Sequence, residues 1–134
     1  MFKTVLFPIE QSREARGAAE TVGKLVQTAS SRLVLLSVVE AADKSQDENV
    51  MTSEEAVAKL LKDAHDAFEK AGIEAETIER DGKPSFTICD VADEVEADLI
   101  VMGCRGMGLT QDGASESVTS KVTNLSPCPV LVVP

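Results

Sequence analysis

The chain has 134 residues, of which 43% are hydrophobic and 27% charged, and its net charge is −10 from 23 acidic and 13 basic residues. This length and composition are typical of one globular domain with a real core, and they exclude a disordered or collagen-like chain. The negative charge argues against nucleic-acid binding and against docking on anionic membranes, because both need clustered positive charge.

The first third of the chain predicts a strand, a helix and a second strand. Residues 5–9 form a short apolar run that Pro8 interrupts, as expected of a buried strand. Ser12 is a suitable N-cap, and apolar residues recur at helical spacing over 15–26. Residues 33–39 are apolar on both faces, which is typical of a strand covered by helices on both sides.

The middle of the chain predicts an acidic loop over residues 40–51, a helix and a weaker strand. Thr52 and Glu55 have the spacing of a capping box, which predicts that the helix starts there and presents an apolar face over 57–68. The strand is expected around Ile73 to Ile78, followed by a turn over residues 80–83.

The last third repeats the alternation. Pro84 can open a helix at its first position, and Leu99–Met102 predicts a fourth strand followed by a glycine-rich loop. A short helix carries apolar residues from Val118 to Leu125, and residues 130–133 form the last strand.

Alternating strands and helices predict a doubly wound, Rossmann-like α/β fold: a five-stranded parallel sheet with four helices in one domain, residues 1–134. The last strand, 130–133, is apolar and uncharged, and an exposed edge of that kind invites pairing. We expect it to pair with its own copy in a symmetric homodimer. The alternative is an edge covered by the same chain.

A cytoplasmic location is expected. No apolar run approaches the about 18 residues of a transmembrane helix, and the N-terminus lacks the pattern of a signal peptide. Three cysteines with no CxxC pair do not make a disulfide framework, so the thiols are expected to be free.

Ligands of doubly wound sheets bind at the carboxyl ends of the strands, near the topological switch point. Residues 8–12, 38–40 and 102–108 should converge there, and residues 115–119 offer an anion site at a helix start. Glycines in the third segment let the backbone approach a phosphate, although such a loop also uses glycine simply to turn.

Four segments, residues 3–12, 36–39, 97–103 and 126–133, resemble the universal stress protein family of the UspA type. The resemblance spans the whole chain. It implies the sheet order 3-2-1-4-5 and a role in the stress response. Members that bind ATP carry the motif G-2x-G-9x-G-(S/T), with base and ribose contacts from the first two strands.

Gly103 and Gly106 match the first two glycines of this motif and Ser117 matches its final hydroxyl, but Glu116 stands where the third glycine is due. Position 10 also departs, with Glu where the family usually has Asp. The resemblance implies base and ribose contacts at Pro8, Glu10 and Val38, and phosphate contacts at Gly103, Gly106, Ser117 and Val118. Met102 at the strand end, Arg105 as a loop cation and Glu116 complete the candidate cofactor-binding residues.

Glu116 should lower the affinity for a nucleotide, because its carboxylate would lie close to a phosphate bound at the helix start. Like charges about 4 Å apart cost about 1 to 4 kcal/mol. That is about a 5- to 1000-fold loss. Its carboxylate either turns to water and leaves a weakened site, or folds onto the helix amides and mimics a phosphate. Two functions remain open: weak binding of ATP, ADP or AMP, with divalent metal only through the nucleotide, or no nucleotide and action through an unknown protein partner.

No catalytic or metal site is predicted, so we expect a binding or signalling protein and not an enzyme. His65 is the only histidine and lies at the edge of an apolar helix face without a partner. The alternative is a slow ATP-hydrolysing or adenylate-transferring enzyme of the same fold, although the His-x-Gly-His signature is absent. Cys104 is either a reversibly oxidised thiol or a small buried residue, while Cys89 and Cys128 are expected near the core.

Overall fold

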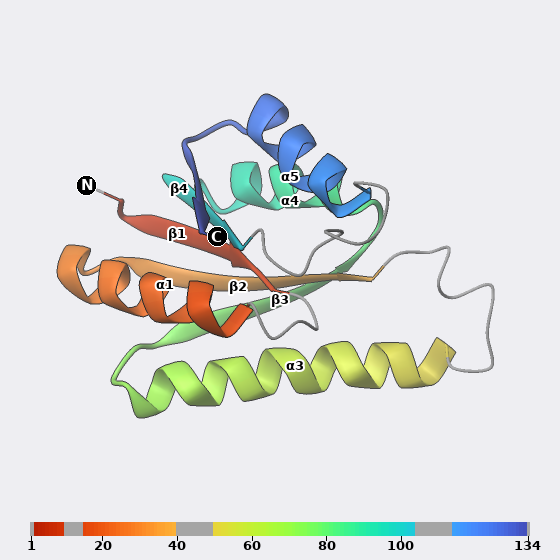
Figure 1. Cartoon of the computed structure of the whole chain (residues 1–134). Helices are drawn as coiled ribbons and strands as arrows, with labels where there is room; N and C mark the ends of the chain where they lie inside the picture. The colour runs from red at the N-terminus through yellow and green to blue at the C-terminus, as the bar shows by residue number, and fades with distance from the viewer. Residues whose placement is uncertain (1, 10–14, 40–49, 104–113, 134) are drawn as a thin grey trace.

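The computed structural model describes residues 2–9, 15–39, 50–103 and 114–133, with backbone alone for 15–17, 50–54, 56 and 114–117 (Figure 1). Strands and helices alternate along the chain, as the apolar patterning predicts. Their bounds are β1 (Thr4–Pro8), α1 (Ala15–Ala29), β2 (Arg32–Val39), α3 (Val50–Lys70), β3 (Ala75–Asp81), α4 (Pro84–Glu94), β4 (Leu99–Gly103), α5 (Ala114–Leu125) and β5 (Val130–Val133).

All five strands run parallel in the order β3-β2-β1-β4-β5, which confirms the expected sheet. Helices α1 and α3 cover one face, and α4 and α5 cover the other (Figure 1). Because parallel strands need crossover connections, the helices between them supply both covering layers.

Each central strand feeds two separate cores, because successive side chains point to opposite faces. Val5 and Phe7 join the core beneath α1 and α3, where the Phe7 and Phe68 rings meet edge to face at 6.5 Å. Leu6 and Ile100 join the core beneath α4 and α5, and both are fully buried. This double coverage explains the continuous apolar runs of the strands.

Two predicted boundaries are wrong. Helix α3 begins at Val50, so Thr52 lies inside the first turn and does not cap the helix. Strand β3 begins at Ala75 and continues to Asp81, because Arg80 and Asp81 pair with the end of β2. An edge strand tolerates these charged residues, since one side of it faces water. Pro84 opens α4, as predicted.

Gly82, in the turn between β3 and α4, has a φ of 145°, and a Cβ there would lie 2.6 Å from Oγ1 of Thr87. Gly82→Ala should therefore lower the free energy of unfolding by about 1–3 kcal/mol through backbone strain. Adding Thr87→Ala should recover only the part that comes from the contact. Chemical denaturation measures both changes.

Gly23, inside α1, is the matched control. A Cβ there would lie 3.6 Å from Cδ1 of Ile73, an ordinary contact. Gly23→Ala should raise the free energy of unfolding by about 0.5–1 kcal/mol, because alanine favours a helix over glycine. Equal effects of the two Gly→Ala changes would contradict the assignment of strain to Gly82.

Candidate functional site

The candidate site lies at the edge of the sheet where β1, β2 and β4 end (Figure 1). Strand β1 connects through α1 to β2 on one side, whereas β4 connects through α5 to β5 on the other. The two connections leave neighbouring strands in opposite directions. This is the topological switch point, where doubly wound sheets bind ligands.

Backbone hydrogen bonds fix the ends of these strands. The N–H of Ile9 donates to the carbonyl of Leu36 at 2.8 Å, and the N–H of Gly82 donates to the carbonyl of Val39 at 3.0 Å. The strands on either side of β2 are therefore both tied to its last residues. These bonds fix the backbone of β2 on both sides of Val38, whose side chain is half-buried.

Three candidate residues come together in one apolar cluster. Val38 from β2, Met102 from β4 and Val118 from α5 all pack in the core beneath α4 and α5. Met102 is only 3% exposed and supports the site from below, whereas Val38 and Val118 are half-buried. An apolar surface of this kind suits the flat face of a base.

The structure describes only some of the residues in the polar part of the predicted site. Pro8 and Gly103 are half-buried at the ends of β1 and β4. Glu10, Arg105 and Gly106 lie outside the described residues, as does Cys104. Glu116 and Ser117 lie in the first turn of α5, which begins at Ala114. The first N–H groups of a helix have no intrahelical partner, so this turn presents donors to an anion.

His65 lies away from the carboxyl ends of the strands. It is on α3, 3.3 Å from the carboxylate of Asp66 through Nδ1, and it borders a hollow beside the starts of β2 and β3. The described part of the chain contains no group of three or more His, Cys, Asp or Glu residues that could hold a metal ion. No described helix combines the length and apolar character needed to cross a membrane.

The hollow beside His65 was missed by sequence reasoning. Its residues come from α1, β2, α3 and β3, and no local motif links them. The one signal in the sequence is the cluster of acidic residues around Ile73, which an edge strand also explains.

The family model described as the universal stress protein family matches residues 1–134. The chain belongs to this family. Universal stress protein Sll1654 of Synechocystis sp. is 63% identical over 136 residues, which cover 100% of this chain and 87% of that protein. The predicted resemblance is therefore confirmed over the whole chain.

Solved structures agree with this assignment. The structure of hypothetical protein MJ0577 is similar with a TM-score of 0.84 and 28% identity, over 99% of this chain and 96% of that chain. A universal stress protein in complex with cAMP gives a TM-score of 0.79 at 24% identity, over 99% and 97% of the two chains.

A universal stress protein from Archaeoglobus fulgidus in complex with dAMP gives a TM-score of 0.74 at 21% identity, over 100% of this chain and 98% of that chain. At identities this low, the likeness to the two nucleotide complexes shows the shared fold.

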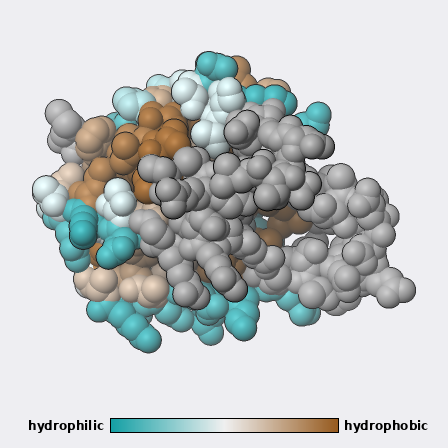
Figure 2. Space-filling view, in the orientation of Figure 1, coloured by the Kyte–Doolittle hydropathy of each residue, from teal (hydrophilic) through white to brown (hydrophobic). Residues whose placement is uncertain are grey.

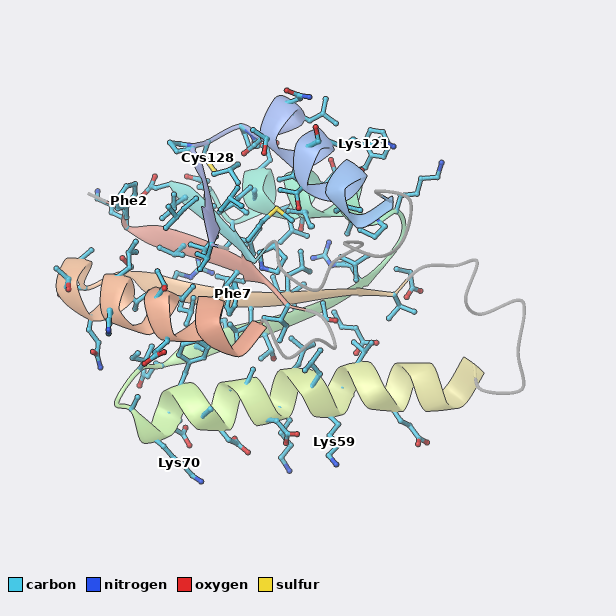
Figure 3. All side chains as sticks on the ribbon, viewed as in Figure 1. Phe2, Phe7, Lys59, Lys70, Lys121 and Cys128 are labelled. Carbon is cyan, nitrogen blue, oxygen red and sulfur yellow. The ribbon has the colours of Figure 1, made fainter. Side chains whose placement is uncertain are left out.

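The two described cysteines of this universal stress protein have thiols whose pKa is raised. Cys89 lies on α4. Cys128, labelled in Figure 3, lies where the chain enters β5. Burial raises the pKa of Cys89, and the charges of Asp90 and of Cys128 raise it further. Burial also raises the pKa of Cys128, against a smaller opposing effect of its hydrogen bond with Ser126.

A raised pKa leaves less thiolate, the reactive form, at neutral pH. In a Cys104→Ser variant, iodoacetamide should therefore alkylate Cys89 and Cys128 slowly at neutral pH, and the rate should keep rising beyond pH 9.0, their ordinary pKa. Mass spectrometry of the labelled peptides measures the two rates. Unfolding in urea is the control and should accelerate both, whereas a plateau below pH 9.0 in the folded protein would contradict the raised pKa values.

Proposed function

We propose that this universal stress protein is a cytoplasmic binding or signalling protein that takes adenine nucleotides in the crevice at the switch point. The observation that carries this function is that Val38 near the end of β2, Met102 near the end of β4 and Val118 near the start of α5 belong to the same hydrophobic core. This arrangement offers a surface for a base on one side and unpaired helix N–H groups for a phosphate on the other. The cAMP and dAMP complexes of structurally similar proteins support this ligand class.

We further propose that Glu116 weakens this binding. It occupies the third position of α5, where a bound phosphate would approach the helix. Its negative charge opposes that of the phosphate, and the opposition grows with the number of phosphate groups. AMP is therefore expected to bind better than ATP, and any divalent metal enters only with the nucleotide.

Binding is favoured over catalysis because of where the general acid–base candidate lies. The single histidine of the sequence, His65, borders the opposite edge of the sheet and does not reach a nucleotide at the switch point. The cytoplasmic location is supported by the free thiols of Cys89 and Cys128, since that compartment keeps thiols reduced.

Replacing Glu116 tests this function. Glu116→Gly should raise the affinity for AMP by about 5- to 1000-fold, because it removes both the charge and the bulk of the side chain. Glu116→Gln keeps the bulk and should show the part that is due to charge. Isothermal titration calorimetry measures the affinities.

Glu55→Gln, an exposed carboxylate on α3, is the matched control and should leave the affinity unchanged. ATP should be recovered intact from the same solutions. If neither Glu116 variant gains affinity, the carboxylate does not oppose the phosphate, and turnover of ATP would favour the enzyme instead.

We also propose a homodimer through β5. The two edges of the sheet differ in chemistry: β3 carries Glu79, Arg80 and Asp81, whereas β5 carries Leu131 and Val132, which are 37% and 39% exposed. Figure 2 shows the apolar surface over β5. Charged side chains discourage edge pairing and apolar ones favour it, so the second copy is expected at β5.

Val132→Lys should therefore convert the dimer to a monomer, because it buries a charge against the second copy. Thr77→Lys on β3 is the control and should leave the dimer intact. Sedimentation velocity measures the mass of each variant, and thermal unfolding checks that both remain folded. A monomeric wild-type protein, or a dimer that survives Val132→Lys, would overturn this interface.

A further inference from the structure

A hollow lies at the amino ends of the strands, opposite the carboxyl ends where the nucleotide is proposed to bind. It has a volume of about 780 Å³ and opens between the ends of α1 and α3, over the starts of β2 and β3. We call it the amino-edge groove and define it by Val26, Arg32, Glu69, Ile73, Glu74 and Glu76. The proposed nucleotide-binding function does not use it.

The floor of the amino-edge groove is apolar and firmly held. Val26 and Ile73 are 4% and 6% exposed, and both belong to the core beneath α1 and α3. The side-chain amide of Gln27 donates to the carbonyl of Ala71 at 3.0 Å, which ties the end of α1 to the segment after α3. The groove therefore has a preformed shape.

The walls of the groove are negatively charged. The guanidinium of Arg32 donates to both carboxylate oxygens of Glu76, through Nη2 at 2.8 Å and through Nε. The hydrogen bond with Arg32 lowers the pKa of Glu76, and the charge of Arg32 is neutralised by the Glu76 carboxylate. Glu69 and Glu74 have no ion pair or side-chain hydrogen bond among the described residues, so their charges are not compensated within that part of the chain.

The surroundings add to this negative potential. Helices α1 and α3 both end at the groove, and the C-terminus of a helix carries a partial negative charge. A neighbouring hollow of about 470 Å³ shares Arg32 and adds, among its described residues, Glu94, Glu96 and Asp98 against the one further cation Lys3. Asp98 already accepts hydrogen bonds from the backbone N–H groups of Lys3 and Thr4.

We propose that the amino-edge groove docks a lysine-bearing segment of a partner protein. A lysine has an apolar stem that matches Val26 and Ile73 and an ammonium group that matches Glu69 and Glu74. The complementarity of shape and charge favours a basic peptide over an acidic or purely apolar one. The nucleotide crevice is not needed for this contact.

The probe is a fluorescein-labelled heptapeptide of alternating lysine and leucine, with blocked ends, titrated at low salt and followed by fluorescence anisotropy. Glu69→Gln with Glu74→Gln should weaken its binding by about twofold to thirtyfold, because two surface ion pairs are lost. Both side chains are exposed, so the fold should be preserved. Arg32→Gln should strengthen binding, because it releases the carboxylate of Glu76.

The matched control is Glu20→Gln with Glu79→Gln, two exposed carboxylates outside the groove that change the net charge equally. This variant should lose less than about twofold in affinity, since distant surface charges are screened. Amide chemical shifts should move at Gln27, Gly72 and Ile73.

Equal losses in the two double variants would overturn the proposal in favour of a general attraction to the net charge of −10. So would chemical shifts confined to other surfaces, or no binding at low salt. Spermine that binds the same amides as tightly as the peptide would also overturn it, because the groove would then select a small polycation and not a protein segment.

Discussion

The central strands β2, β1 and β4 are buried on both faces, and this constraint organises the rest of the molecule. A strand with two apolar faces needs a helix layer on each side, which the crossover connections supply. Val5, Leu33 and Val101 face one layer, while Leu6, Val34 and Ile100 face the other. With the two layers in place, the strand ends are the main parts of the sheet left open, so the candidate nucleotide site and the amino-edge groove lie at opposite ends of the strands.

Much of this fold can be predicted from the sequence because burial on both faces leaves a local signal. The apolar run of β2 and the helical spacing in α1 each depend on neighbours in the chain. The ends of the helices and strands are harder to predict from the sequence. Thr52 has a capping pattern, yet the helix begins at Val50, and Arg80 has the composition of a turn, yet it extends β3. Pairing with β2 overrides the local turn preference at Arg80.

The candidate nucleotide site and the amino-edge groove differ in how far they could be predicted from the sequence. Pro8, Val38 and Gly103 follow from the rule that ligands meet the carboxyl ends of parallel strands, combined with a family motif. Val26, Glu69 and Glu74 come from three segments that only tertiary packing brings together, and no motif names them. The pair of Arg32 and Glu76 depends on the register of β2 with β3, which local pattern does not specify.

Strand β2 joins the two ends of the molecule directly. Arg32 stands at its first residue and Val38 near its last, and six residue steps of an extended strand measure about 20 Å. Its inner residues are locked between two packed layers, so it acts as a rigid spacer. A ligand at one of the two proposed sites would therefore leave the other site uncovered.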